Sequence, residues 1–308
     1  MPQPTSPGDY ADFYRQSIAP DTREAFWLEQ ARAIDWHQAP QQACDYHNPP
    51  FARWFADGQL NLCHNAVDRH LAQRADQPAI IAVSTETNTE RVYTFAQLHE
   101  EVQRMAAVLQ SFGVGKGDRV QIYMPMIAEA AFAMLACVRL GAIHSVVFGG
   151  FASVSLASRI DDAQPKVVIS ADAGSRGGKA IAYKPLLDEA LQLAKHKPAA
   201  VLLVDRGLAP MPLQAGRDHL WSTLRTQPQF SEAKVPCTWL NSSDPSYILY
   251  TSGTTGKPKG VQRDTGGYAV ALASSMQHIF AGKAGQTFFT TSDIGWVVGH
   301  SYIIYGPL

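Results

Sequence analysis

The spacing of apolar and polar positions changes along the chain, and from residue 79 onward two patterns alternate. Short β-branched and aromatic runs, typical of buried strands, occur at 79–84, 119–124, 143–148, 166–170, 200–205, 247–251 and 287–292. Segments 95–112 and 127–140 carry apolar residues at helical spacing. This alternation predicts an α/β fold with a mostly parallel sheet that is covered by helices.

The first seventy residues differ, because they hold several tryptophans and a His-Asn-Pro-Pro turn at 47–50 without alternating strands. A helical pattern is found at 23–34. We therefore predict two parts, a helical cap at 1–70 and a sheet domain at 71–308. Residues 206–236 contain several prolines and no sustained period, so they are predicted to connect parts of the sheet.

Segment 127–148 is apolar enough for a membrane span to be considered. Glu129, Arg139 and His144 interrupt it, and Gly141 divides it, so we predict a buried helix followed by a buried strand. The first ten residues lack a basic stretch followed by an apolar core, and no secretory signal is expected.

The composition is that of an ordinary globular protein, with 46% hydrophobic and 17% charged residues and a formal net charge of -1. Without a basic field, neither nucleic acid nor a membrane is an expected partner. The cysteines form no CxxC pair, which argues against a zinc ribbon and a disulfide framework. We expect reduced, buried thiols in a cytoplasmic protein, at Cys44, Cys63, Cys137 and Cys237.

A loop rich in glycine, hydroxyl residues and lysine follows the predicted strand 247–251. Glycines let backbone N–H groups approach a ligand, and hydroxyls and lysines add donors and positive charge, so the loop suits a polyphosphate. The candidate phosphate-binding residues are Thr251, Ser252, Gly253, Thr254, Thr255, Gly256, Lys257, Lys259 and Gly260. A Walker A loop is excluded, because its glycine spacing differs and Pro258 follows the first lysine. A solvated turn is the alternative.

Residues 249–260, Leu-Tyr-Thr-Ser-Gly-Thr-Thr-Gly-Lys-Pro-Lys-Gly, closely resemble the phosphate-loop motif of the acyl-adenylate-forming enzymes. Residues 93–98, 141–151, 176–179 and 293–302 resemble the acyl-CoA synthetase branch, and the cap is similar to the amino-terminal region of acetyl- and propionyl-CoA synthetases. The resemblance covers nearly the whole chain and is closest to the propionate-activating members, with acetate as the alternative acid. It implies ATP, Mg²⁺ carried by the nucleotide, and coenzyme A, and no metal site of the protein itself.

The run Arg176-Gly177-Gly178-Lys179 places two cations around two glycines beyond a predicted strand, a geometry that suits a phosphate. The resemblance implies that it holds the 3′-phosphate of coenzyme A. Taken alone, such a run is more often a surface turn. By the same resemblance, the adenine end of coenzyme A lies close to Gly149 and Gly150, whose alternative role is a tight turn after a strand.

Trp296, Val297 and Val298 are predicted to line a small apolar pocket for a short carboxylate. The resemblance also implies that Val298 lies beside the pantetheine of coenzyme A. Similar acetyl-CoA synthetases usually carry threonine at this position, and the difference favours propionate as the acid. Trp296 could instead belong to the core. His300 could lie near the reacting carboxylate or be a structural histidine, and both readings stay open.

The resemblance implies two steps: the carboxylate attacks the α-phosphate of ATP to give acyl-AMP, and the thiol of coenzyme A then displaces AMP. Lys257 and Lys259 would steady the leaving pyrophosphate, and no enzyme nucleophile is required. The chain ends at Leu308 before the family's adenine-binding segment and carboxy-terminal domain would be expected. We therefore expect an amino-terminal portion that forms no acyl-AMP alone.

The sequence is also compatible with two other functions. The chain could be a non-catalytic module that binds a nucleotide or coenzyme A, or an inert product. It could also be an adenylation domain that loads a carrier protein, a reading disfavoured by the cap and by residues 176–179.

Overall fold

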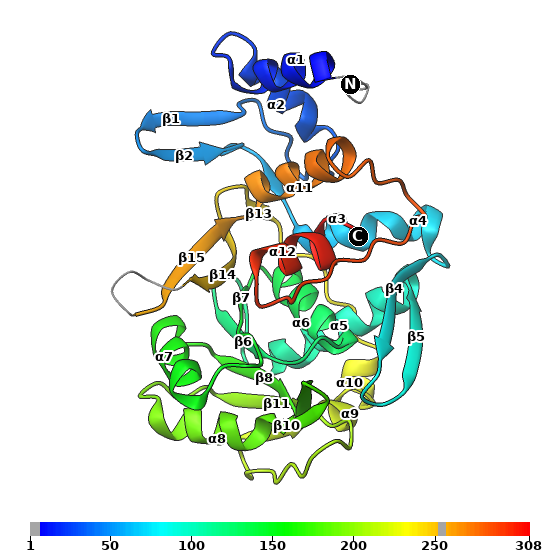
Figure 1. Ribbon diagram of the computed structural model, residues 1–308, viewed down its shortest axis with the longest axis vertical. Helices are drawn as coiled ribbons and strands as arrows, with labels where there is room; N and C mark the ends of the chain where they lie inside the picture. Colours follow the sequence, from blue (N-terminus) through cyan, green and yellow to red (C-terminus); the bar gives the residue numbers. More distant parts are fainter. Residues whose placement is uncertain (1–6, 252–256) are drawn as a thin grey trace.

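The main sheet has seven strands in the order β12-β11-β8-β6-β7-β14-β15. This computed structural model describes residues 7–251 and 257–308 (Figure 1). Neighbouring strands run parallel except for β15, which pairs antiparallel with β14 at one edge. The strands are β6 Arg119–Tyr123, β7 Ile143–Val146, β8 Val167–Ala171, β11 Ala200–Val204, β12 Asp218–Leu220, β14 Pro245–Thr251 and β15 Lys259–Asp264. The predicted mostly parallel α/β fold is thereby confirmed.

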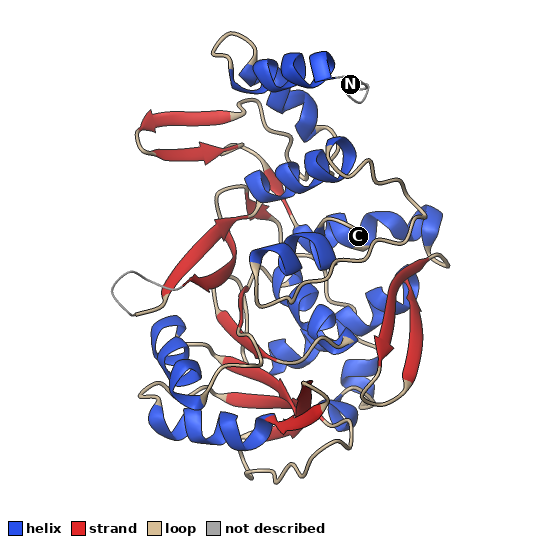
Figure 2. Ribbon diagram, in the orientation of Figure 1, coloured by secondary structure: helices blue, strands red, loops and turns tan. Residues whose placement is uncertain are grey.

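Helices cover both faces of this sheet (Figure 2). Along β8, Val167 and Ile169 belong to one apolar cluster and Val168 to the other, because successive side chains of a strand point to opposite faces. The first cluster contains α5 Phe95–Ser111 and α6 Ala128–Arg139, and the second contains α7 Ser153–Ala163 and α8 Tyr183–Leu193. Both long helices predicted from spacing are therefore confirmed.

The amino-terminal segment lies at one end of the molecule, where a hairpin and two helices extend away from the sheet (Figure 1). Its elements are α1 Pro7–Ile18, α2 Arg23–Ala31, β1 Cys44–Asn48, β2 Phe51–Trp54, β3 Gln59–Leu60, α3 Leu62–Ala66, the 3-10 helix Asp68–His70 and α4 Leu71–Arg74. The predicted helical cap needs one correction, because this segment also contains the antiparallel hairpin of β1 and β2. The turn at 47–50 joins β1 to β2, whose largely exposed side chains leave no apolar alternation to detect.

The remaining elements lie outside the main sheet, its four covering helices and the amino-terminal segment. They are β4 Pro78–Ser84, β5 Thr89–Thr94, β9 Ala173–Arg176, β10 Lys179–Ala182, α9 Trp221–Leu224, α10 Pro228–Ser231, β13 Leu240–Asn241, α11 Gly266–His278, α12 Val297–Gly299 and the π-helix His300–Tyr305. Among the described residues, no helix has the length and apolar character to cross a membrane. Segment 127–148 forms α6 and β7, as predicted.

Three sequence predictions need correction. Residues 287–292 form neither helix nor strand, because Phe288 packs edge-to-face on Phe280 and Phe289 is exposed, so the run joins no sheet. The predicted strand at 79–84 exists as β4 but pairs with β5 in a separate antiparallel sheet. The predicted connection 206–236 contains β12, an edge strand of the main sheet, together with α9 and α10.

The four cysteines are free, as expected. Cys63 and Cys137 are buried, whereas Cys44 and Cys237 are partly exposed. The expectation of burial therefore holds for two of them.

Candidate functional site

The candidate phosphate loop connects β14 to β15 at the edge of the main sheet. Tyr250 is paired with Gly260 and Thr251 with Lys259, so the loop closes an antiparallel hairpin. The candidates Ser252, Gly253, Thr254, Thr255 and Gly256 lie outside the described residues. Thr251, Lys257 and Lys259 are exposed, and within the described ranges neither lysine forms an ion pair. A Cβ at Gly260 would lie 3.0 Å from Cγ2 of Ile248, which gives this glycine a packing role.

Arg159 of α7 links the strand that enters the loop to the turn after β7. Its guanidinium lies 5.4 Å from the ring centroid of Tyr250 and 4.4 Å from that of Phe151, both within cation–π range. The Tyr250 hydroxyl donates to Asp162 Oδ2 at 2.6 Å. Burial and this hydrogen bond raise the pKa of Tyr250, so its hydroxyl keeps its proton. The start of the loop is thus held against α7.

Only glycine fits at position 149, because the Tyr183 side chain packs closely against it. A Cβ at Gly149 or at Gly174 would overlap the Tyr183 hydroxyl, which lies between the two glycines. Burial, with a contribution from the Asp293 carboxylate, raises the pKa of Tyr183 to about 12. At Gly150, a Cβ would overlap the ring of Phe148. Close packing therefore requires glycine at both positions after β7, and their proximity to coenzyme A stays a prediction.

Residues 176–179 form the tip of the hairpin β9–β10, in which Arg176 pairs directly with Lys179. Gly177 and Gly178 have φ values of 59° and 76°, and two consecutive residues with positive φ are characteristic of a type I′ turn. The glycines are therefore required by the backbone, as the surface-turn alternative states. Lys179 is exposed, and the tip leaves the sheet directly after β8, where the carboxyl ends of parallel strands meet.

The candidate acyl-pocket segment packs on the same turn after β7. The ring of Trp296 lies 6.0 Å from that of Phe148, and a Cβ at Gly295 would lie 3.0 Å from the Phe148 backbone. The side chains of Trp296, Val297 and Val298 are 50%, 47% and 45% exposed. Trp296 is thus no core residue. A closed acyl pocket would need further atoms over these side chains.

His300 lies inside the core, with no exposed surface. Its ring is 5.2 Å from that of His144 and 4.6 Å from that of Tyr247, and neither ring nitrogen has a hydrogen-bond partner within the described part of the chain. Burial lowers the pKa of His300 to about 3, so the ring is neutral near pH 7. This placement favours the structural alternative for His300.

Two residues at the site were not predicted from the sequence. Tyr183 fills the space between two glycines, and Arg159 connects the turn after β7 to β14. Glycines with no obvious turn partner were the available signal, but the sequence does not tell which side chain lies beside them. The turn at 148–151 is therefore the point where the phosphate-loop strand, the β9–β10 hairpin and the Trp296 segment meet.

Two family models match the chain. One, AMP-binding enzyme, matches residues 67–308, and the other, acetyl-coenzyme A synthetase N-terminus, matches residues 10–66. The chain belongs to the AMP-binding enzyme family, and the family predicted from the phosphate-loop motif is confirmed.

Three relatives illustrate the similarity. A propionate–CoA ligase of Escherichia coli is 62% identical over 97% of this chain and 47% of its own length. The human mitochondrial acyl-CoA synthetase short-chain family member 3 is 46% identical over 98% of this chain and 44% of its own. The solved structure of an acetoacetyl-CoA synthetase from Streptomyces lividans matches with a TM-score of 0.86 and 26% identity, over 99% of this chain and 46% of its own. The chain thus spans about half the length of the curated relatives it matches.

Proposed function

We propose that this chain supplies the phosphate-binding and coenzyme-A-binding part of an AMP-forming propionate–CoA ligase. The reaction converts propionate, ATP and coenzyme A to propionyl-CoA, AMP and diphosphate through propionyl-AMP. The 62% identity to a propionate–CoA ligase supports this acid, and acetate is the alternative.

The observation that carries the proposal is the meeting of three segments at residues 148–151. Phe151 reaches the phosphate-loop strand through Arg159, Gly149 reaches the β9–β10 hairpin through Tyr183, and Phe148 contacts Trp296. Nucleotide, coenzyme A and acid must meet in one place for group transfer, because reacting atoms need to be held within about 3–3.5 Å. The crevice beyond the carboxyl ends of parallel strands is the usual ligand position in such folds.

Each segment has a task in this proposal. Lys257 and Lys259, exposed beside the loop and without an acidic partner among the described residues, neutralise the phosphates of ATP. Lys179 and Arg176 bind the 3′-phosphate of coenzyme A, and the half-exposed Trp296 segment contacts the acyl chain. Mg²⁺ bound to the nucleotide supplies further neutralisation of charge.

Binding of ATP to the chain tests the phosphate site. Lys257→Ala is expected to weaken ATP binding by about 10-fold or more, because a charge-assisted hydrogen bond contributes about 1.5–3 kcal/mol. Lys283→Ala is the matched control, since Lys283 is also exposed but lies beyond α11. Isothermal calorimetry measures both. Equal ATP affinity of the two variants would contradict the proposed role of the loop.

Turnover is tested in a chimera, because the relatives are about twice as long as the aligned region. This chain is joined to the remaining part of the Escherichia coli relative, and propionyl-CoA formation is followed with propionate and with acetate. We expect kcat/KM for propionate to exceed that for acetate by about 10-fold or more, since one methylene is worth about 1–3 kcal/mol. A preference for acetate supports the alternative acid. Binding of ATP without turnover supports a non-catalytic module.

A further inference from the structure

Two of the free cysteines lie next to each other where the amino-terminal segment meets the segment before β13. β3 and β13 pair antiparallel with Leu60 opposite Leu240. Cys63 lies three residues after Leu60, and Cys237 lies three residues before Leu240. Their sulfur atoms lie within 4.8 Å of each other. Cys63 is buried, and Cys237 is partly exposed. The two thiols therefore lie side by side, although they come from parts of the chain that are far apart in sequence.

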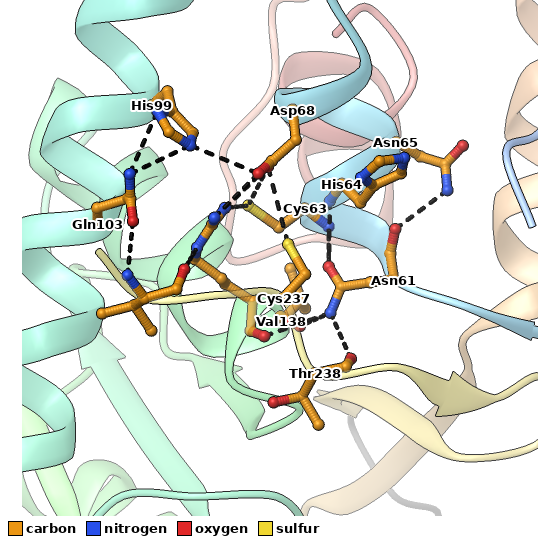
Figure 3. Close-up of polar contacts among 12 residues, drawn as sticks. Asn61, Cys63, His64, Asn65, Asp68, His99, Gln103, Val138, Cys237 and Thr238 are labelled. Atoms are coloured by element: carbon orange, nitrogen blue, oxygen red, sulfur yellow. Dashed lines mark hydrogen bonds and ion pairs between the residues drawn. The ribbon is translucent and has the colours of Figure 1, made fainter. Parts of the chain in front are cut away.

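A partly buried carboxylate, Asp68, accepts hydrogen bonds from both thiols (Figure 3). Each thiol donates to Asp68 Oδ2 at 3.8 Å. Arg139 donates from Nη1 to Asp68 Oδ2 at 2.8 Å and from Nη2 to Oδ1 at 2.9 Å, and its Nη1 also lies 3.4 Å from Cys63 Sγ. His99 lies 3.4 Å from Asp68 Oδ1 on the opposite side. The shared acceptor orients the two thiols toward one point.

A metal ion is a poor fit for these ligands, because Arg139 already supplies the positive charge. Cys63, Asp68 and Cys237 could offer three ligand atoms to a thiophilic metal. Such a metal would require two deprotonated thiols, and Asp68 would have to share its charge between the metal and Arg139, which is 3% exposed. A buried guanidinium that loses its partner is strongly destabilising. A disulfide is neutral, and it leaves the pair of Asp68 and Arg139 unchanged.

We propose that Cys63 and Cys237 form a modification site, which a hydroperoxide oxidises to an intramolecular disulfide. The sulfur of Cys237, the more exposed of the two, attacks the peroxide oxygen, forming a sulfenic acid and releasing an alcohol, or water from hydrogen peroxide. The sulfur of Cys63 then attacks the sulfenic sulfur and releases water. Two thiols lose two protons and two electrons, and one O–O bond is reduced. The disulfide links α3 covalently to the segment before β13.

The environment of Cys237 predicts a slow first step. The hydrogen bond to Cys63 and then burial raise the pKa of the Cys237 thiol, and the Asp68 carboxylate acts in the same direction, whereas Arg139 opposes it. Because the thiolate is the reactive form, little of it is present near pH 7. Oxidation is therefore expected to need an excess of peroxide.

Peptide mapping tests the proposal. The full chain is treated with hydrogen peroxide, remaining thiols are alkylated, and the protein is digested without reductant. We expect a linked peptide pair containing Cys63 and Cys237, lighter by two hydrogens than its reduced parts and separated by dithiothreitol. The unfolding midpoint should rise by about 5 °C, because the link closes a long loop.

Two variants make the outcome decisive. Cys44→Ser is the matched control for a partly exposed cysteine and should leave the link intact, whereas Cys237→Ser should abolish it and leave Cys63 alkylated only after unfolding. The proposal is overturned by a link that contains Cys44 or Cys137, or by a Cys237 that is oxidised to sulfinic acid without a link. Thiols that a chelator, rather than dithiothreitol, makes available for alkylation would equally overturn it and indicate a bound metal.

Discussion

Replacing Asp68 by asparagine keeps the volume of the side chain but removes the charge that faces Arg139. The Arg139 side chain is 4% exposed and is held by two hydrogen bonds from its guanidinium to this carboxylate. Breaking a buried ion pair from one side leaves an uncompensated charge and costs about 3–5 kcal/mol. With about 2.1 cal/mol/K of unfolding entropy per residue, we expect the melting temperature of the 308-residue chain to fall by about 5–8 °C.

Urea denaturation at pH 7 measures this loss as a change in the free energy of unfolding. The control is Lys116→Ala, which breaks the ion pair of Lys116, whose side chain is 50% exposed, with Asp244 at 2.8 Å; it should cost less than about 1 kcal/mol. In the double variant Asp68→Asn/Arg139→Met, the loss should be smaller than the sum of the two single losses. Equal stability of Asp68→Asn and Lys116→Ala would refute the reasoning.

Acid unfolding gives a second test of the same ion pair. Burial of the Asp68 carboxyl opposes its ionisation, but hydrogen bonds from His99 and Arg139 outweigh burial and hold its pKa well below the usual range. A carboxyl group whose pKa is lowered by folding contributes stability at pH values above its usual pKa. This contribution is lost as the pH falls below that pKa. Between about pH 5 and pH 2, the parent chain should therefore lose more stability than Asp68→Asn.

Three further predictions concern the crevice and the helix α5. Gly149→Ala should cost about 1–3 kcal/mol in thermal unfolding, because the added methyl overlaps the Tyr183 hydroxyl, and adding Tyr183→Phe should recover part of the loss. Gly178→Val and Gly216→Val both force a branched side chain to positive φ, at 76° and 78°, and should destabilise the chain similarly; only Gly178→Val should weaken coenzyme A binding in calorimetry. Thr94→Ala removes a capping box and should cost about 1 kcal/mol in urea denaturation, with ATP affinity unchanged.

The parts of the fold that the sequence predicted are those with long, uninterrupted apolar patterns. Helix α5 combines four buried apolar positions at helical spacing with a capping box, and β8 and β11 are buried at every position. Strand β12, by contrast, has only three residues, all partly exposed, and its pairing with β11 is set by tertiary contacts. For residues 287–292, a strand was predicted but is not formed, because the aromatic run packs without joining a sheet.

At the site, the structure gives physical reasons for several residues that the sequence alone did not supply. The pair Gly177 and Gly178 was predicted to help hold a phosphate or to form a surface turn; the turn between β9 and β10 requires two residues with positive φ, and the phosphate contact stays a prediction. The need for glycine at 149 comes from Tyr183, which lies more than thirty residues further along the chain. His300 stood in a segment that matched a family motif, but burial is a property of the folded chain and cannot be read from neighbouring residues.

The hydrogen bonds of the Asn61 side chain are completed by residues that are synthesised much later. Its Oδ1 accepts from the N–H groups of Cys63 and His64 at the start of α3, whereas its Nδ2 donates to Val138 O at 2.7 Å and to Thr238 O at 2.8 Å, 177 residues away. At about 5–20 residues per second, a ribosome needs about 9–35 s to add that stretch. During this time α3 exists without its partners. The hydrogen bond from Asn61 to Thr238 can therefore form only after residue 238 has been synthesised.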